Sequence, residues 1–187
     1  DFKDRVNNEL IANLGNFVHR TLTFIKTKND GVVPKPKKLE TEDEALLQFI
    51  TNQVDLVGET IDKFQMMNGL SRAMTLAQEG NKYFQGKEPW KNENDTTLYL
   101  CANLVRSLAI VFEPFLPQTS QKIWDMLALE GSVHEQKWDD AKKQEIQPGH
   151  KISEVQALFQ KIEDDQIHDF AKKHLPTEKE EQENRQE

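Results

Sequence analysis

The stretch TEDEALLQFITNQVDLVGETIDKF, residues 41–64, has the apolar spacing of a long amphipathic helix. At its start, Thr41 and Glu44 form a capping-box pattern, in which a hydroxyl and a carboxylate each satisfy an unpaired backbone N–H. Apolar residues then recur every three or four positions, as the buried face of a helix requires; they are Leu46, Phe49, Ile50, Val54, Val57, Ile61 and Phe64. The pattern predicts a helix that begins at Thr41 and ends near Asn68 and Gly69.

Stripes of the same kind lie on both sides of this helix. They predict a first helix over residues 2–25 and a third over residues 70–84. A fourth, over residues 98–112, meets Pro114 and Pro117, where we expect a kink or break before the pattern resumes. Another capping-box pair predicts a last helix; it is formed by Ser153 and Gln156, ahead of the apolar residues Val155, Leu158, Phe159 and Ile162.

The composition agrees with an all-helical protein. Only 8 Gly and 7 Pro among 187 residues leave little material for the tight turns of a β-sandwich or barrel, and good helix formers recur throughout. We predict an all-α fold, a bundle of about five or six helices over residues 1–174. Residues 175–187 are rich in Glu, Lys and Gln and are predicted to be an acidic linker or frayed tail.

The chain shows no sequence sign of secretion, membrane insertion or metal binding. Its single cysteine, Cys101, cannot form an internal disulfide or a multi-thiolate zinc site. No stretch approaches the roughly 20 apolar residues that cross a bilayer. We expect a cytoplasmic protein, in the cytosol, with no metal and no membrane partner.

The net charge of −8 argues against a nucleic-acid ligand, because contacts to a phosphate backbone need Lys and Arg. The charge is uneven, however. Residues 1–38 hold two arginines and six lysines, and the predicted loop at residues 32–39 places three of these lysines between and after two prolines. A local basic patch is compatible with this distribution, whereas a global one is excluded.

Polar residues of the predicted first helix lie unusually close to its buried face. At 100° per residue, Asn13, Asn16 and Arg20 share one strip beside the apolar stripe, while His19 lies opposite that stripe. Amides and a guanidinium can read base edges, and arginine also binds phosphate. The alternative is that these groups cap the surface or hydrogen-bond between helices.

Trp90 follows Pro89 in a polar stretch between two predicted helices, where exposure is expected. An exposed indole suits stacking on unpaired bases, which contributes roughly 1–3 kcal/mol per base. The alternative is that Trp90 folds back as a lid over the end of the bundle. Trp124 and Trp138 are instead predicted to be packing residues.

The inventory of motifs excludes the common classes of enzyme site. The sequence has no nucleophile elbow, no glycine-rich phosphate loop and no pair of Cys or His residues at metal-binding spacing. Carboxylate clusters such as Asp139-Asp140 are more typical of solvated helix ends than of acid–base pairs. We therefore predict that this chain carries no catalytic residues.

Four stretches together resemble the anticodon-binding domain of class I methionyl-tRNA synthetases, of the eukaryotic cytosolic type. The first runs from FKDRVNNEL at residues 2–10 to NLGNFVHR at residues 13–20. The others are DGVVP at residues 30–34, EPWK at residues 88–91 and PGHKI at residues 148–152. Their order also matches the family, with Leu116-Pro117 in the broken fourth helix, so the resemblance covers nearly all of residues 1 to about 170.

The resemblance implies which residues contact RNA. It implies that Asn16 and Arg20 hydrogen-bond the first anticodon base, a cytosine, and that Trp90 stacks on the unstacked anticodon of methionine tRNA. It also implies contacts to the tRNA backbone from four further residues, Asn13, Lys35, Lys37 and Lys38.

The resemblance further implies a larger enzyme. In the family, ATP and methionine bind a catalytic domain in cis whose signature motifs do not occur here, so we expect no cofactor in this fragment and no aminoacylation by it alone. The Lys/Glu-rich end resembles the linker to an appended domain, which suggests a multi-synthetase complex as partner. Two alternatives stay open: the corresponding domain of a cysteinyl, valyl or isoleucyl enzyme, and a helical scaffold that binds partner proteins.

Overall fold

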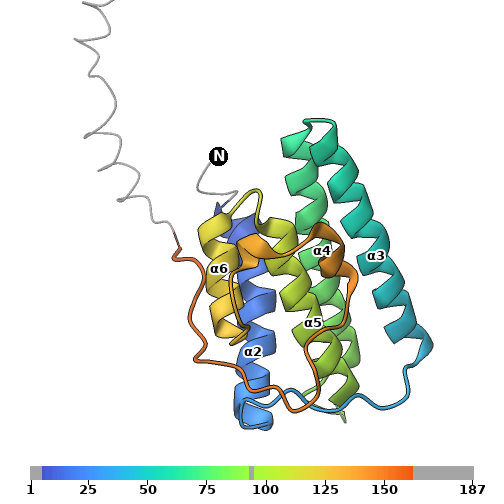
Figure 1. Ribbon diagram of the computed structural model, residues 1–187. Coiled ribbons are helices and arrows are strands. Elements are labelled where there is room, and N and C mark those ends of the chain that lie inside the picture. The colour runs from blue at the N-terminus through green and yellow to red at the C-terminus, as the bar shows by residue number, and fades with distance from the viewer. Residues whose placement is uncertain (1–5, 93–94, 162–187) are drawn as a thin grey trace, which may run out of the picture.

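The computed structural model describes residues 6–92 and 95–161 and is a helical bundle (Figure 1). A π-helix, η1 (Val6–Gly15), runs directly into α2 (Asn16–Lys28). The other long helices are α3 (Thr41–Asp62), α4 (Met66–Lys87), α5 (Asp95–Phe112) and α6 (Pro117–Met126), followed by the short 3₁₀ turns η2 (Val133–Glu135) and η3 (Trp138–Lys142). The prediction of an all-α bundle is confirmed, with five α-helices in the described part of the chain.

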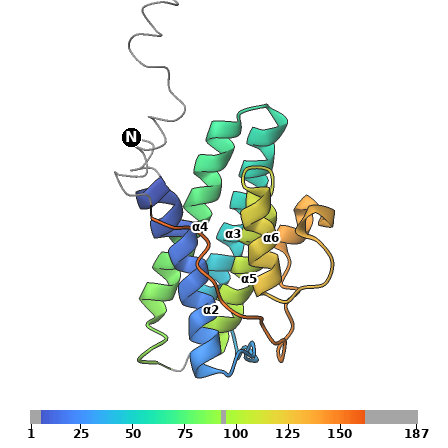
Figure 2. The same ribbon diagram turned by 90° about the vertical axis from the view of Figure 1, so that its left-hand side faces the viewer.

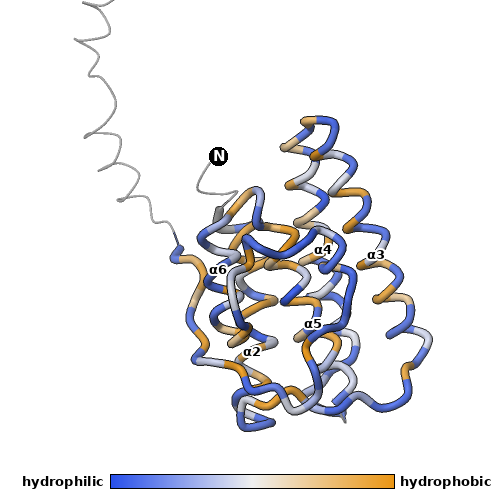
Figure 3. The backbone as a smooth tube through the Cα atoms, in the orientation of Figure 1, coloured by the Kyte–Doolittle hydropathy of each residue, from blue (hydrophilic) through white to orange (hydrophobic). Residues whose placement is uncertain are grey.

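Helix α5 is the centre of the core. All but three of its residues are buried, and it packs against α2, α3, α4 and α6. By length and composition alone it is apolar enough to span a membrane, contrary to our reading of the sequence, but 83% of it is buried inside the protein. The other helices alternate hydrophobic with hydrophilic residues along their length, as Figure 3 shows, so they cover α5 with one face each.

Two buried polar residues of α5 hold the chain that follows α6. The amide of Asn103 accepts from the backbone N–H of Ile146 at 2.9 Å and donates to its carbonyl at 3.3 Å. One turn further, the buried guanidinium of Arg106 donates to the backbone carbonyl of Asp140 at 2.7 Å and pairs with Glu145. These bonds attach to the bundle a segment whose only regular elements are the short 3₁₀ turns η2 and η3.

The predicted start of α3 at Thr41 is confirmed, but its predicted capping pair and its predicted end were wrong. The cap is Glu40 rather than Thr41, because the carboxylate of Asp43 accepts from the Glu40 backbone N–H at 2.9 Å. The helix ends at Asp62, and Phe64 is 92% exposed with a φ of 57° instead of belonging to the core. The chain reverses at residues 63–65, so the last predicted apolar position falls on the turn.

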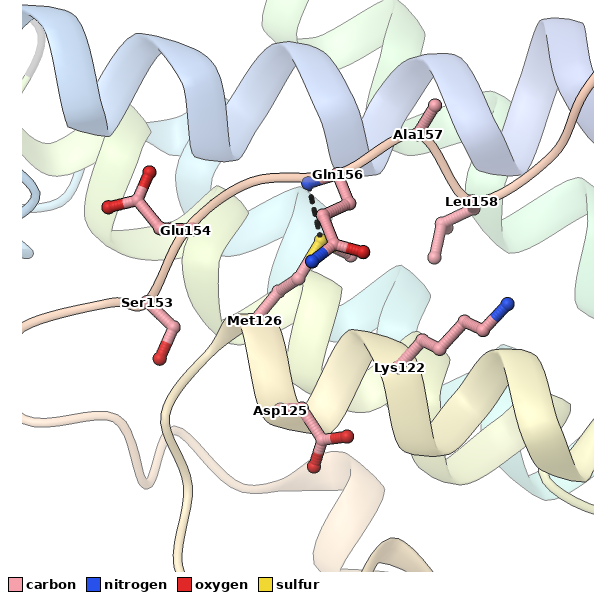
Figure 4. Close-up of a pocket in the computed structure, with 8 residues that line it drawn as sticks. All are labelled: Lys122, Asp125, Met126, Ser153, Glu154, Gln156, Ala157 and Leu158. Atoms are coloured by element: carbon pink, nitrogen blue, oxygen red, sulfur yellow. Dashed lines mark hydrogen bonds between the residues drawn. The ribbon is translucent and has the colours of Figure 1, made fainter.

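The predicted last helix is absent from its described part. Residues 153–161 form an extended segment, and Ile162 and the expected boundary near residue 175 lie outside the described residues. The backbone N–H of Ser153 donates to the Met126 carbonyl at 2.9 Å, and that of Gln156 donates to the Met126 sulfur at 3.2 Å (Figure 4). At the start of a helix these backbone N–H groups would need a capping side chain, whereas here Met126 of α6 supplies their acceptors. The segment then crosses α2 (Figure 2).

Two of the stretches that carry the family resemblance pair with each other. Residues 31–33 lie against residues 149–152 as an isolated bridge, with backbone bonds of 2.8–2.9 Å. Gly31 and Gly149 have positive φ values of 76° and 88°, which a side chain would strain. The ring of His150 completes the junction through a 2.6 Å hydrogen bond with the Leu127 carbonyl. This junction closes the bundle at the end where α2 meets the loop before α3.

Helices α2 and α4 approach closely at Gly80. A methyl group at this position would lie 2.8 Å from the Phe17 ring and 2.9 Å from Leu104, well inside contact distance. Gly86, on the same helix, has nothing within 4 Å of that position. The absence of a side chain at Gly80 therefore sets the separation between α2 and α4.

We expect Gly80→Ala to be less stable than Gly86→Ala by about 1–3 kcal/mol, the usual cost of overpacking a core. The gain in helix propensity is roughly 1 kcal/mol at the interior position Gly80 and no larger at Gly86 in the last turn of α4, so a lower stability of Gly80→Ala reports the packing. Urea unfolding followed by circular dichroism measures it. Equal stability of the two variants would show that the helices do not depend on this close approach.

Candidate functional site

The side chains predicted from the first helix meet a matching row on α4. The amide Nδ2 of Asn16 donates to Oδ1 of Asn81 at 3.3 Å, and Nη2 of Arg20 donates to Oε1 of Gln85 at 3.2 Å. On each helix the two residues are four positions apart, so they lie one above the other. The result is a polar ladder across the α2–α4 contact, just outside the packing of Phe17 against Gly80.

Arg20 and Trp90 meet through one ring. The guanidinium carbon of Arg20 lies 4.9 Å from the centre of the Phe84 ring, and the Trp90 ring lies 6.3 Å from Phe84 at a tilt of 37°. Trp90 packs against Phe84 yet stays 42% exposed, so it is not the fully closed lid of the alternative interpretation. Asn16, Arg20 and Trp90 are thus brought together on one surface.

The positive charge of Arg20 is not neutralised by a carboxylate in the described part of the chain. Its recorded partners are the neutral amide of Gln85 and the face of Phe84. Several other cations of the described residues are paired with acids; among them are Lys26, Lys87, Arg106, Lys142 and Lys143. In an acidic chain, Arg20 therefore offers free charge to a ligand.

Asn13 does not join the ladder through its side chain. It belongs to the π-helical turn, where the α-helical angle of 100° per residue does not hold, and its amide donates to the Asn8 carbonyl at 3.5 Å. Its own carbonyl instead accepts from Asn81 at 2.9 Å. His19 and Asn16 both line a hollow of about 250 Å³, and Phe159 is a further lining residue.

The predicted lysines lie at the same end of α4 as Trp90. Lys37 and Lys38 line a hollow of about 380 Å³ with Asn92, two residues after Trp90, and the backbone N–H of Lys37 donates to the Thr96 hydroxyl at 2.9 Å. Lys35 is exposed and is not part of this lining. Carboxylates also line the hollow, so its charge is mixed; they are Glu40, Asp43 and Asp95.

A buried charged cluster fastens the end of α4 to the start of α3. Asp43 accepts from the hydroxyl of Tyr83 at 2.7 Å and from the ammonium of Lys87 at 2.9 Å, and Lys87 also reaches Glu40 and Glu42. Burial raises the pKa of Asp43, but its hydrogen bonds with the Glu40 backbone, Lys87 and Tyr83 together hold it below its ordinary value. Tyr83 of this cluster directly precedes Phe84 in the sequence, so the cluster fixes the position from which the Trp90 loop starts.

The described residues offer little support for a reactive cysteine or a metal site. Cys101 is buried in α5, and burial raises the pKa of its thiol. In residues 6–92 and 95–161 no group of three His, Cys, Asp or Glu side chains is placed to hold a metal ion.

Sequence reasoning missed the residues of α4 that complete the surface. Phe84 is the last residue of the apolar stripe that predicted the third helix, and it was given no role at the surface; Asn81 and Gln85 were not singled out. Their spacing of four positions equals that of Asn16 and Arg20. It had no meaning until the structure placed α4 beside α2.

Comparison with known proteins bears on this surface. The chain matches the family model described as "Anticodon binding domain of methionyl tRNA ligase" over residues 33–179. It is 42% identical over 173 residues to a methionine–tRNA ligase of Pyrococcus abyssi, covering 89% of this chain and 23% of that protein. The ligase of Methanopyrus kandleri is 39% identical over 184 residues, covering 95% and 26% respectively.

A solved structure agrees. The apo form of Mycobacterium tuberculosis methionyl-tRNA synthetase superposes with a TM-score of 0.77 at 27% identity, covering 86% of this chain and 34% of that one. The chain spans about a quarter of the length of the curated relatives it matches. The family model begins at Val33, so Trp90 lies inside its match whereas Asn16 and Arg20 precede it.

We expect Asp43→Asn to lower the free energy of unfolding by about 1–3 kcal/mol at pH 7, because Lys87 loses its buried counter-charge. Since the folded pKa of Asp43 is depressed, its contribution is present above the ordinary carboxyl pKa and is lost as the pH falls through the folded value. The difference from the native chain should therefore shrink below about pH 4. Urea unfolding at pH 7 and at acid pH measures this, with the exposed Asp62→Asn as the control. A constant difference across that range would contradict the assignment.

Proposed function

Because the chain belongs to the family of anticodon-binding domains of methionyl-tRNA ligases, we propose that Asn16, Arg20 and Trp90 form its binding surface for the unpaired anticodon bases. The observation that carries the proposal is the arrangement of Arg20 and Trp90 on the shared ring of Phe84. It offers an uncompensated guanidinium and an accessible indole within one cluster. These are the two groups that unpaired RNA bases use most, for hydrogen bonding and for stacking.

The proposed mechanism divides the work among the three residues. Trp90 holds a base that has left the stack of the anticodon loop, and Asn16 and Arg20 hydrogen-bond the first anticodon base, a cytosine. This division is supported by the ladder of polar groups across α2 and α4. Few contacts then carry the specificity, so a net charge of −8 does not prevent binding.

Backbone contacts are proposed for the residues around this core. Lys37 and Lys38 are supported by their place beside the loop after Trp90, and Lys35 by its exposure. Asn13 is less well supported, because its amide turns back to the Asn8 carbonyl. These contacts add affinity that does not depend on sequence.

The rest of the enzyme is also a proposal. We propose that a catalytic domain in the longer protein binds ATP and methionine, that the protein works in the cytoplasm, and that this chain alone does not aminoacylate tRNA. The Lys/Glu-rich end supports a eukaryotic cytosolic type and a multi-synthetase complex as partner. The relatives named above are archaeal and bacterial, so this finer assignment rests on that composition alone.

A second candidate function is protein contact at the turn between α3 and α4. Phe64 is 92% exposed and Met67 is 70% exposed, at the end of α4 opposite to Trp90. Exposed apolar side chains of this size are typical of protein-contact surfaces. Salt-sensitive binding of an anticodon stem-loop distinguishes the two functions, since a pure scaffold shows none.

We expect Trp90→Ala to weaken binding of a methionine-tRNA anticodon stem-loop by about tenfold or more, the worth of one stacked base. Fluorescence anisotropy of a labelled RNA gives the dissociation constant. Phe64→Ala is the matched control, because it removes an exposed aromatic ring at the opposite end of the same helix. Equal affinity of the Trp90 variant and the native chain would eliminate the stacking role.

Arg20→Lys should weaken the same RNA by about fivefold or more while leaving the charge unchanged, because lysine lacks the planar donor fork. Arg72→Lys, at an exposed position of α4, is the control. If Arg20→Lys binds normally, Arg20 acts as a charge alone and does not read a base.

A further inference from the structure

Asn81 is bound in a way that leaves its amide one orientation. It is half-buried between α4 and η1, and its Nδ2 atom donates to two backbone carbonyls, that of Asn13 at 2.9 Å and that of Ala77 at 3.2 Å. Only the NH₂ end of an amide can satisfy two carbonyl oxygens, because the other end is itself an acceptor. The Oδ1 atom of Asn81 must therefore face the opposite way, toward Asn16.

This orientation passes to Asn16. Since Asn81 presents an acceptor, Asn16 turns its own NH₂ toward it, giving the 3.3 Å bond. The Oδ1 atom of Asn16 then faces away from α4 on an exposed side chain. Within residues 6–92 and 95–161 no hydrogen bond reaches that oxygen. The Asn16 oxygen is thus a hydrogen-bond acceptor available to a ligand, next to Arg20 and Trp90.

We propose that Asn81 is a positioning residue that fixes the Asn16 amide with its oxygen outward, so that the site selects a first anticodon base with an exocyclic amino group. The inference rests on the proposed function. Cytosine carries an amino donor at C4, where uracil carries a carbonyl acceptor. The Asn16 oxygen accepts from the first and meets a second acceptor in the other, so cytosine is favoured and uracil is disfavoured.

Without Asn81 the Asn16 amide no longer supplies this preference. An asparagine amide that is free to rotate about its last bond presents either its donor or its acceptor, and so accommodates both bases. Asn81 touches no base in this scheme. Its removal should therefore change the ratio of the two affinities more than the affinity for either base alone.

The test uses anticodon stem-loops that differ only in the first base: cytosine, uracil, or pyrimidin-2-one, which lacks the amino group. We expect the native chain to prefer cytosine over each of the other two by about fivefold to tenfold, the worth of one such hydrogen bond. For Asn81→Ala the three affinities should fall within about twofold of one another. Gln78→Ala, at an exposed position of the same helix, should keep the native ratios.

Three outcomes would overturn parts of this scheme. If the native chain binds none of the RNAs, the proposed function fails and the inference with it. If it binds but does not distinguish cytosine from pyrimidin-2-one, the inference fails alone, and no variant is needed to show it. If Asn81→Ala remains folded by circular dichroism and keeps the native ratios, Asn81 does not position Asn16.

Discussion

The close approach of α2 and α4 at Gly80 is the constraint on which the rest of the surface depends. Phe17 fills the place where a side chain would stand, so the helices lie near enough for short amides to meet across them. Asn16 reaches Asn81 at 3.3 Å only at this separation. A larger residue at position 80 would clash with Phe17 of α2 and Leu104 of α5, and so would disturb the separation on which the polar ladder depends.

A second requirement is that the ends of α4 and α2 stay in place. The Asp43, Tyr83 and Lys87 cluster ties α4 to α3 beside Phe84, and the pairing of residues 31–33 with residues 149–152 holds the chain after α2. Buried charge is a costly way to join helices, and it depends on complete hydrogen bonding. Here each partner of Asp43 is engaged, which gives the Trp90 loop a rigid base.

The spacing of apolar residues predicted the helices well, because it reports which face of a helix is buried. It failed at helix ends, where a turn or a neighbouring element determines the backbone hydrogen bonds. Phe64 continues the stripe of α3 but falls on a turn, and Ser153 looks like a cap but donates to the carbonyl of Met126. Asn16, Arg20 and Trp90 could be singled out because their polarity or exposure conflicts with local pattern. Asn81 could not, because its meaning depends on which helix lies beside it.

Charge explains why so few contacts carry so much of the proposed recognition. Most cations of this acidic chain that the structure pairs are held by carboxylates, and the hollow beside Lys37 and Lys38 is lined by acids as well. Arg20 is not among these paired cations, because its partners, Gln85 and Phe84, are neutral. A neutral amide can orient a guanidinium without cancelling its field, whereas a carboxylate would do both. An α2–α4 ladder built from amides rather than ion pairs therefore orients Arg20 and leaves its charge uncancelled, as the proposed recognition of RNA requires.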